Sequence, residues 1–427
     1  MGRRIAIIGA GSTYTPELIE GLTGPGALAI DELVLEDRDA ARLDVVGGLA
    51  QRMAAHRGWR GRMTLTTDLD AALTDADFVL VQLRVGGQAA RLLDETIPLR
   101  FGTIGQETTG AGGFAKALRT VPVVLDIAER AARLAARGSW LIDFTNPVGI
   151  VTQALLDAGH RAIGLCNIGV IMERRMATVL GVDARAVQLA HVGLNHLSWE
   201  QRVLVDGTDR LPGLLEAHAG EWAAEVGRDG PSLCSLGVLP SSYLRYFDAF
   251  GAVLAEQRRD GTRARDVIEI ERGLLAQYAD PGLVSKPALL ERRGGAFYSE
   301  AAARLVESLA TATGTVQVVN VRNGGAVPGM ADDDVVEVSA RVDAGGAEPL
   351  PTTPLPAALL ALMRQVKAYE RLAIRAARSG AREDARRALE ANPLVGPRIG
   401  DVGPLLDALL EAHAEHLPRF AARSRGR

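Results

Sequence analysis

The feature that most limits the possible folds is the alternation, over the first 200 residues, of short apolar segments with longer segments of helical periodicity. The apolar segments are almost continuously hydrophobic, as in strands that helices cover on both faces. Alternating strands and helices form βαβ units around a parallel sheet. We therefore predict a doubly wound α/β fold. The predicted strands are Arg4–Ile8, Glu32–Glu36, Met63–Thr66, Phe78–Gln82, Trp140–Phe144 and Ala162–Leu165, and the predicted helices are Pro16–Leu22, Ala40–Ala55, Ala115–Ala136 and Val148–Asp157.

After His196 the pattern changes, because long helices now dominate over scattered strands. The stretch 343–356 contains Gly and Pro and is predicted to be a loop. The change indicates a second, mixed α+β domain. Its predicted strands are Ser198–Val205, Val316–Val321 and Val335–Val342, and its predicted long helices are Arg263–Tyr278 and Pro356–Ser379.

Composition excludes several classes of partner. With 48 basic and 52 acidic residues, the chain has no basic excess that would bind a nucleic-acid backbone. No apolar stretch reaches the roughly 18–20 residues that span a bilayer, and the N-terminus does not resemble a signal peptide. The two cysteines cannot form a disulfide framework. We expect a cytoplasmic protein that acts on a small molecule, without nucleic acid or membrane.

The first predicted strand leads directly into the sequence Gly9-Ala-Gly-Ser-Thr-Tyr14. Two glycines permit a tight turn and close approach of the main chain to a pyrophosphate at the N-terminus of the next helix. Tyr14 stands where the G-x-G-x-x-G fingerprint has its third glycine, so a turn that merely joins strand and helix is the alternative. The candidate cofactor ligands in this turn are Gly9, Gly11, Ser12 and Thr13.

The second predicted strand ends in Glu36-Asp37. A carboxylate at this point would accept hydrogen bonds from an adenosine-ribose diol and would repel a 2′-phosphate. The position therefore favours NAD over NADP, with Asp37 as the candidate ligand. The alternative is that both acids cap the helix predicted from about Ala40.

Polar residues also follow the fourth, fifth and sixth predicted strands of the parallel sheet, and the carboxyl ends of such strands are where parallel sheets place ligands. Arg84 follows the fourth predicted strand and is a candidate clamp for an anion or a hydroxyl, unless it is simply solvated. Asn146 follows the fifth strand, and Cys166 with Asn167 follows the sixth. We expect these side chains to converge on one crevice.

The polar stretch 105–113 is unusually rich in glycine and precedes the helix predicted from Ala115. It is either a mobile loop over the site or a plain linker.

Cys166 and His196 are the candidate metal ligands. About 30 residues apart, they are too sparse for a structural zinc site, which needs four ligands in short paired spacings. They suit a catalytic divalent ion whose coordination substrate oxygens complete. The alternative is that Cys166 is a small buried hydrophobe and His196 a core histidine.

Seven motifs, in register across both predicted domains, together resemble those of one known family. It is glycoside hydrolase family 4, the NAD- and metal-dependent glycosidases, and most closely its 6-phospho-β-glucosidases. The resemblance extends from about residue 3 to about residue 415. The motifs are Gly9-Ala-Gly-Ser-Thr-Tyr-Thr-Pro16, Ile104-Gly-Gln-Glu-Thr-Thr-Gly-Ala-Gly-Gly-Phe114, Phe144-Thr-Asn-Pro147, Gly164-Leu-Cys-Asn167, Gly193-Leu-Asn-His-Leu197, Tyr243-Leu-Arg-Tyr246 and Arg293-Gly-Gly-Ala-Phe-Tyr-Ser299.

The resemblance implies a fold like that of lactate and malate dehydrogenases, with a Rossmann-like NAD-binding domain over residues 1–196 and a substrate and oligomerisation domain over 197–427. It implies a homodimer or homotetramer. It also implies an elimination in which NAD⁺ takes hydride from C3 of the sugar, and Mn²⁺ or another divalent metal polarises the resulting ketone. A base then removes the C2 proton and the aglycone leaves from C1. Water adds at C1 and the ketone is reduced back, so NAD is recycled.

Matched position by position, the resemblance makes Cys166 and His196 the metal ligands and Tyr243 the base for C2. A tyrosine base needs a lowered pKa, which the metal and Arg263 would supply. Arg265, two residues further along the same helix, would point about 200 degrees away. The substrate-binding residues implied are Arg84, Asn146, Asn167 and Arg263.

Asn167 bears on the anomer. In members of the family that cleave α-glycosides, an aspartate after the metal cysteine acts as the general acid. Asn167 occupies this position here, and asparagine cannot donate a proton in that role. The sequence therefore favours a β-glycoside, cleaved to glucose 6-phosphate and an aglycone. Gly169 replaces the proline of the family pattern Cys-Asn-x-Pro, which puts the rigidity of this loop in question. No motif identifies a 6-phosphate, so an unphosphorylated glycoside is the alternative substrate.

Two other functions fit the same scaffold. An NAD-dependent 2-hydroxyacid or sugar dehydrogenase would use a His/Asp proton relay and an arginine pair, whereas the candidate site offers Cys, Asn, His and Tyr. A non-catalytic sensor of NAD or a sugar phosphate would need neither metal ligands nor a base, the roles in which Cys166, His196 and Tyr243 are expected.

Overall fold

The computed structural model describes residues 2–24, 27–294, 297–311 and 313–424. Its amino-terminal half is built on six parallel strands in the order β3-β2-β1-β4-β5-β6. This is the order of a doubly wound dinucleotide-binding sheet, with its switch point between β1 and β4. All six strands lie where the sequence predicts them: β1 Arg3–Ile8, β2 Ile30–Glu36, β3 Arg62–Thr66, β4 Phe78–Val81, β5 Trp140–Asp143 and β6 Ala162–Gly164.

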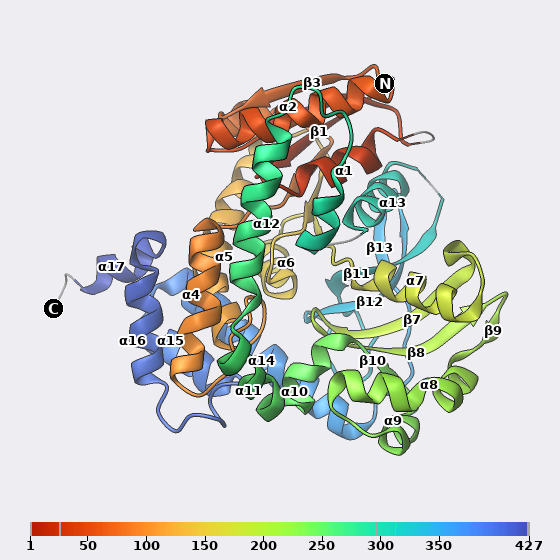
Figure 1. Ribbon diagram of the computed structural model, residues 1–427, viewed down its shortest axis with the longest axis vertical. Coiled ribbons are helices and arrows are strands. Elements are labelled where there is room, and N and C mark those ends of the chain that lie inside the picture. The colour runs from red at the N-terminus through yellow and green to blue at the C-terminus, as the bar shows by residue number, and fades with distance from the viewer. Residues whose placement is uncertain (1, 25–26, 295–296, 312, 425–427) are drawn as a thin grey trace.

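Helices connect and cover these strands (Figure 1). Every residue of β4 is buried, so both faces of the sheet are covered at its centre. The helices of this half are α1 Thr15–Leu22, α2 Ala40–His56, α3 Leu69–Leu73, α4 Gly87–Arg100, α5 Gly110–Leu134, α6 Val148–Asp157 and α7 Ile168–Leu180.

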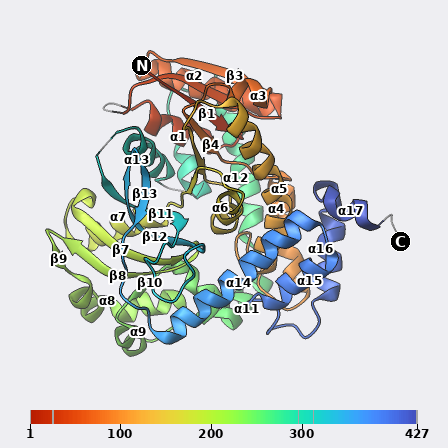
Figure 2. The ribbon, with the colours of Figure 1, turned by 180° about the vertical axis from the view of Figure 1, so that it is seen from behind.

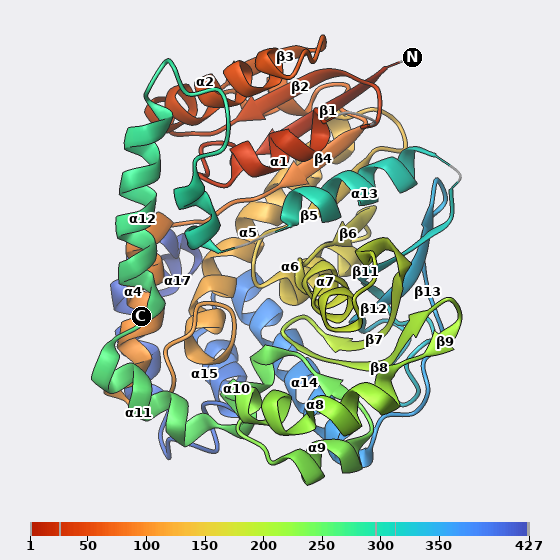
Figure 3. The same cartoon turned by 45° about the vertical axis from the view of Figure 1, so that its right-hand side comes forward.

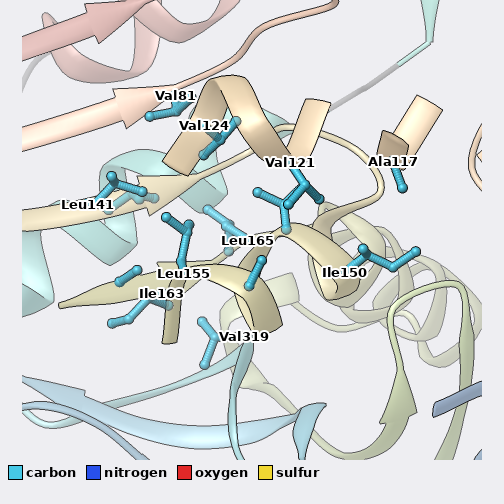
Figure 4. Packing of buried hydrophobic residues seen from close by; sticks show 14 of the residues in the cluster. Val81, Ala117, Val121, Val124, Leu141, Ile150, Leu155, Ile163, Leu165 and Val319 are labelled. Atoms are coloured by element: carbon cyan, nitrogen blue, oxygen red, sulfur yellow. The ribbon is translucent and has the colours of Figure 1, made fainter. Parts of the chain in front are cut away.

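The central core lies where α5 and α6 pack on the middle strands. Figure 4 shows Val121 and Val124 of α5 above Leu141 of β5, with Leu155 of α6 beside Ile163 of β6. Each such side chain contributes about 1.5–3 kcal/mol when it is fully buried. This packing fixes the carboxyl ends of β4, β5 and β6, from which Arg84, Asn146 and Cys166 emerge.

The sheet does not stop at the end of the first half. Antiparallel strands extend it beyond β6 in the order β11-β12-β7-β8-β10, so one sheet runs through both halves of the chain. Short strands β9 and β13 pair with β8 and β12. The bounds are β7 Val187–Leu194, β8 Leu197–Val205, β9 Thr208–Asp209, β10 Leu239–Pro240, β11 Thr315–Arg322, β12 Val335–Asp343 and β13 Gly346–Pro349.

The prediction of a loop over 343–356 was wrong in part, because β13 lies within it. Gly345 and Gly346 turn the chain back, and Gly346 has a φ of +132°. The returning strand pairs with the end of β12. Its Gly, Ala, Glu and Pro carry no strand signal in the sequence, and an edge position tolerates them.

The C-terminal half supplies most of the remaining helices. α12 runs along one side of the molecule from α2 to α4 (Figure 3), and α14, α15 and α16 pack on α4 and α5 (Figure 2). No helix in the described parts of the chain is long and apolar enough to cross a membrane. The longer helices are α8 Leu211–Val226, α11 Phe250–Asp260, α12 Arg263–Tyr278, α13 Tyr298–Ala310, α14 Ala357–Ser379, α15 Arg382–Ala391 and α16 Gly403–Ala412, and the shorter ones are α9 Gly230–Leu236, α10 Arg245–Asp248 and α17 Pro418–Ser424.

The glycine-rich stretch 105–113 is neither a plain linker nor a loop throughout, because α5 already begins at Gly110. A Cβ atom on Gly105 would lie 1.7 Å from the carbonyl oxygen of Glu95, and one on Gly112 would lie 2.4 Å from that of Gln106. The glycines therefore allow close contact between main-chain segments. This contact fixes residues 106–109 beside the site.

Candidate active site

The glycine turn after β1 is tight at both glycines. Gly9 has a φ of +85°, and a Cβ atom on it would lie 2.9 Å from the carbonyl oxygen of Gln82. A Cβ atom on Gly11 would lie 2.7 Å from Asp37 Oδ2, the atom that accepts a 2.9 Å hydrogen bond from Gly11 N. Position 9 therefore requires glycine, and a side chain at position 11 would displace the Asp37 carboxylate. Asp37 holds the turn against the end of β2.

The acidic residues after β2 do not cap α2, so the alternative interpretation of Glu36 and Asp37 is wrong. The N-cap of α2 is Asp39, whose side chain accepts a hydrogen bond from Arg42 N. Burial and the neighbouring charge of Asp37 raise the pKa of Glu36 to about 7. The residue that caps the helix, Asp39, lies two residues after Asp37.

Residues of the C-terminal half hold the same turn. The hydroxyl of Tyr278 donates a 2.8 Å hydrogen bond to the carbonyl oxygen of Thr13, and Arg293 Nε donates one of 2.8 Å to Thr13 Oγ1. Tyr14, in place of the third glycine, packs edge-on against Tyr298 with ring centroids 5.7 Å apart. The departure from the fingerprint thus serves packing between the two halves. Gly295 and Ala296 of the motif that begins at Arg293 lie outside the described residues.

Cys166 and His196 lie side by side. Cys166 follows β6, and His196 lies in the two-residue turn between β7 and β8. Cys166 Sγ and His196 Nε2 are 3.6 Å apart, and both side chains are buried. A tetrahedral ion with bonds of about 2.3 Å to sulfur and about 2.0 Å to nitrogen places its donors at roughly this separation. Within the described chain no group of three His, Cys, Asp or Glu side chains surrounds one point.

The hydrogen bonds around His196 decide which ring nitrogen carries the proton. Thr108 Oγ1 donates to Gln106 Oε1 at 2.8 Å and lies 2.8 Å from His196 Nδ1. Because a hydroxyl has one hydrogen, Nδ1 must be the donor to Thr108, and the lone pair of Nε2 then faces Cys166. Burial lowers the pKa of His196 to about 4 and raises that of Cys166 to about 12. The imidazole is therefore ready to bind a cation, whereas the thiol must first lose its proton.

The His196 ring stacks on the ring of Tyr243, with centroids 3.7 Å apart and planes within 8°. His196 has a φ of +63°, a conformation that few non-glycine residues adopt. Tyr243 belongs to the 3-10 turn Ser242–Leu244, which follows β10. The tight β7–β8 turn thus presents the imidazole to both the thiol and the phenol.

The protein alone does not lower the pKa of Tyr243. Burial raises it well above 10, and the negative charges of Glu107 and Glu337 add to the effect. Arg263, which we expected to help, is exposed at the start of α12, and its Nη2 donates to the carbonyl oxygen of Arg292 at 2.7 Å. Arg265 is also exposed. Of the two cations expected to lower the pKa of Tyr243, the metal must therefore supply most of the effect.

Asn146 and Asn167 reach the same region from adjacent strands. Asn146 follows β5, and its Oδ1 atom is buried without a hydrogen-bond partner among the described residues. Such an atom costs about 1–3 kcal/mol unless a ligand pairs with it, so it fits a substrate hydroxyl. Asn167 is the N-cap residue of α7, and its Oδ1 lies 3.8 Å from Cys166 Sγ.

A buried ionic cluster surrounds Glu107. Of its residues, the sequence predicted only Arg84 as part of the site. Arg84 forms an ion pair with Glu107, Lys116 Nζ lies 2.9 Å from Glu107 Oε2, and Arg91 Nη1 lies 3.3 Å from Glu107 Oε1. Arg91 also bonds Glu95 at 2.7 Å. Two arginines and a lysine thus surround two carboxylates, and their N–H groups suit an anionic ligand.

The alternative interpretation of Arg84 as a solvated residue is wrong, and the cluster lies beside the candidate metal ligands. Arg84 is not a solvated surface residue, since its side chain is only 21% exposed. Burial and the charge of Arg84 lower the pKa of Lys116 to about 7, and the surrounding cations hold the pKa of Glu107 well below its usual range. Glu107 directly precedes Thr108, the partner of His196. The glycine-dense polar sequence around Glu107 was the available signal.

Gly169 lies in the first turn of α7 and not in a loop, which corrects the expectation about loop rigidity. A Cβ atom on it would lie 2.5 Å from Val318 Cβ on β11. The glycine therefore lets α7 start close against the antiparallel strands. This contact helps to place the Cys166–Asn167 pair, which directly precedes α7.

The fold and the site define an α/β enzyme of dehydrogenase-like topology, in which a dinucleotide-type turn and a thiol–imidazole pair lie on one sheet. A malate dehydrogenase structure from Cryptosporidium parvum has the same fold, with a TM-score of 0.57 and 16% identity over 89% of this chain and all of that one. The model of the family 4 glycosyl hydrolases matches residues 4–182, and the model of their C-terminal domain matches residues 191–395. The chain belongs to glycoside hydrolase family 4.

Two relatives are similar over nearly their whole length. A probable 6-phospho-β-glucosidase of Bacillus subtilis (strain 168) is 39% identical over 98% of each chain. The structure of the 6-phospho-β-glucosidase from Thermotoga maritima with manganese, NAD⁺ and glucose-6-phosphate has a TM-score of 0.90 and 34% identity, over 97% of this chain and 99% of that one. The resemblance inferred from the seven motifs is confirmed.

Proposed function

We propose that the protein is an NAD⁺- and Mn²⁺-dependent 6-phospho-β-glucosidase that releases glucose 6-phosphate and an aglycone. The observation that carries the proposal is the contact of Cys166 with His196, whose ring stacks on Tyr243. Two metal-binding donors and a phenol meet at one point. The two relatives described above are both named as 6-phospho-β-glucosidases, and at 34–39% identity they support the choice of substrate.

When bound, NAD⁺ supplies a reversible hydride acceptor for C3 and the divalent ion supplies a Lewis acid beside the sugar oxygens. Cys166 Sγ and His196 Nε2 would hold the ion, and Thr108 keeps the imidazole in the tautomer that can bind it. Tyr243 Oη is the group that takes the proton from C2, and a dication beside it would lower its pKa.

The substrate residues have separable roles in this proposal. Asn146 Oδ1 accepts a hydrogen bond from a sugar hydroxyl, and Asn167 contacts the sugar beside Cys166. Because asparagine is not a proton donor at physiological pH, the aglycone must be a sufficiently good leaving group by itself, as the β-specific assignment assumes. Arg263, at the start of α12, would contact the substrate by giving up its hydrogen bond to the carbonyl oxygen of Arg292.

The concentration of N–H donors around Glu107 supports a phosphorylated substrate. Arg84, Arg91 and Lys116 can offer several such donors to a phosphate dianion, and Arg in particular bonds two of its oxygens at once. We therefore place Arg84 among the residues that bind substrate.

The turn Gly9–Thr13 and Asp37 are proposed to bind NAD, with the main chain of Gly9, Gly11, Ser12 and Thr13 at the pyrophosphate and Asp37 at the adenosine ribose. In this proposal residues 1–196 form the NAD-binding domain, and residues 197–427 form the substrate and oligomerisation domain. The protein is a cytoplasmic homodimer or homotetramer.

The test is hydrolysis of p-nitrophenyl β-glucoside with and without a 6-phosphate, in a matrix of NAD⁺, Mn²⁺ and reductant. The proposal predicts nitrophenol release only from the phosphorylated substrate, only with both NAD⁺ and Mn²⁺, and without build-up of NADH. Steady NADH formation without nitrophenol would instead establish a dehydrogenase. Release from the unphosphorylated glycoside at the same rate would refute the phosphate assignment.

A further inference from the structure

A row of buried polar side chains crosses the antiparallel part of the sheet. Glu200 on β8 lies directly opposite His191 on β7, and Glu337 on β12 lies directly opposite Asn320 on β11. These strands are neighbours in the order β8-β7-β12-β11, and each of the four side chains is at most 1% exposed. In the middle of a sheet such positions are normally apolar. We therefore expect this row of buried polar residues to serve a function.

The four side chains are joined by hydrogen bonds. His191 Nδ1 lies 2.7 Å from Glu200 Oε1, and His191 Nε2 lies 3.3 Å from Glu337 Oε1. The second oxygen of Glu337 accepts a 2.9 Å hydrogen bond from Asn320 Nδ2 and another of 2.9 Å from Asn195 Nδ2. Glu337 is thus bound on both oxygens. Asn195 extends the row out of the strands and into the β7–β8 turn.

Asn195 connects this row to both candidate metal ligands. It directly precedes His196, and its side chain forms a hydrogen bond with the Cys166 thiol. The amide nitrogen has two hydrogens, so one can bond Glu337 while the other bonds sulfur. Glu337 therefore controls the direction in which the amide points. A rotated amide would turn its oxygen toward the sulfur and repel a thiolate.

The charges of the row also match a dication. The carboxylates of Glu200 and Glu337 raise the pKa of His191 to about 10 although burial opposes it, so the imidazole is a cation between two anions. The group of His191, Glu200 and Glu337 therefore carries one net negative charge. A buried negative charge without a partner is costly, and apolar residues would serve stability better. A divalent cation at the neighbouring Cys166–His196 pair would offset this charge.

We propose that Glu337, held in place by His191 and Glu200, orients Asn195 and thereby presents Cys166 and His196 to a divalent cation as a preset pair. These three residues and Asn195 are positioning residues, because none of them is placed against the cation itself. The inference rests on the proposed function in one respect, which is that Cys166 and His196 bind the metal.

The test measures binding of Mn²⁺ to the full-length protein after removal of metal by a chelator, with reductant present and without substrate. Free Mn²⁺ is followed by electron paramagnetic resonance, and Co²⁺ is used separately because its sulfur-to-metal charge-transfer absorption reports the thiolate bond. The variants are Glu337→Gln, which keeps the shape of the side chain and removes its charge, and Asn195→Ala. Asn195 lies in the turn between β7 and β8, outside the strands. Cys166→Ser shows whether the wild-type signal comes from the proposed ligands.

Glu32→Gln is the matched control. Glu32 is also a largely buried carboxylate, with hydrogen bonds from Arg62 Nη2 at 2.9 Å and Thr64 Oγ1 at 3.1 Å, but it lies on β2 outside the row. We expect Glu337→Gln and Asn195→Ala each to weaken Mn²⁺ binding by about 10–100-fold and to reduce the Co²⁺–thiolate absorption. Glu32→Gln should lower the melting temperature and leave both signals unchanged.

Each outcome has one meaning. If Asn195→Ala and any folded Glu337→Gln protein bind Mn²⁺ as the wild type does, the positioning role is refuted, whatever happens to stability. If Glu337→Gln does not fold, Asn195→Ala alone decides the question. If Cys166→Ser also binds Mn²⁺ like the wild type, the proposed metal site itself fails, and this is distinct from failure of the row.

Discussion

Removal of the Thr108 hydroxyl tests the tautomer of His196 that the hydrogen bonds define. Thr108→Val keeps the shape of the side chain and deletes the oxygen that lies 2.8 Å from His196 Nδ1. His196 is 3% exposed, so water cannot easily replace the lost acceptor. An unpaired buried N–H costs about 1–3 kcal/mol.

The variant can avoid that cost only by moving the proton to Nε2. This atom then faces Cys166 as a donor and has no lone pair for a metal. Because about 1.4 kcal/mol corresponds to a factor of ten in affinity, we expect Mn²⁺ binding to weaken by about 10–100-fold. The assay is titration of Mn²⁺ into the metal-free protein, with ¹⁵N chemical shifts of the imidazole as the direct readout of the tautomer.

Thr109→Val is the matched control. The hydroxyl of Thr109 also donates to Gln106 Oε1, at 3.3 Å, but the ring of His196 is bonded by Thr108. Thr109→Val should therefore leave Mn²⁺ affinity unchanged. Equal affinities of the two variants, or a wild-type imidazole protonated at Nε2, would refute the reasoning.

Three further predictions concern other parts of the molecule. Gly169→Ala places a methyl group 2.5 Å from Val318 Cβ and should lower the free energy of unfolding in urea by about 1–3 kcal/mol, whereas Gly213→Ala, in α8 with open space around it, should not lower it; equal stabilities of the two variants would contradict the packing argument. Tyr243→Phe should abolish glycoside cleavage while Mn²⁺ and NAD⁺ still bind, and cleavage at the wild-type rate would show that the base is another group. The folded pKa of His191, about 10, exceeds its ordinary value of 6.5, so the stability it contributes should be complete below pH 6.5 and lost as pH rises through about 10. The difference in unfolding free energy between wild type and His191→Gln should therefore shrink from pH 6 to pH 10, and a difference that grows over this range would contradict the assignment.

The six strands of the parallel half could be predicted because they are short apolar segments, and α1, α2, α5 and α6 could be predicted from their helical period. The helices α3, α4 and α7 were not predicted. Local pattern also located the residues at the strand ends, including Asn146 and Cys166. Such positions follow from topology alone, since carboxyl ends of parallel strands meet at one edge.

The parts that escaped prediction depend on contacts between distant segments. The pairing of β11 with β6 joins Asn320 to Gly164, and nothing in either strand specifies that register. The roles of Glu337 and His191 follow from the pairings of β12 with β7 and β11 and of β7 with β8, because an isolated charged residue in a strand gives no sign of its partner. Glu107 was hidden for another reason, since a glycine-rich polar stretch looks like a loop until Glu95 and Gln106 are found packed against its glycines.

The capping residue of α2 shows the limit of local reasoning at a finer scale. The sequence Glu36-Asp-Arg-Asp39 offers three acids, and spacing alone did not separate the cap from the residue that closes the glycine turn. The structure assigns the cap to Asp39 and the turn to Asp37, through hydrogen bonds to Arg42 N and Gly11 N.

The central claim is that glycoside cleavage proceeds through removal of the C2 proton by a group of the protein. It is tested most directly by hydrolysis of a 6-phospho-β-glucoside in D₂O with NAD⁺, Mn²⁺ and reductant, followed by mass and NMR analysis of the glucose 6-phosphate formed. The account predicts deuterium at C2 of the product, and none when Tyr243→Phe replaces the wild-type protein. Product formed at the normal rate with the original hydrogen wholly retained at C2 would contradict it.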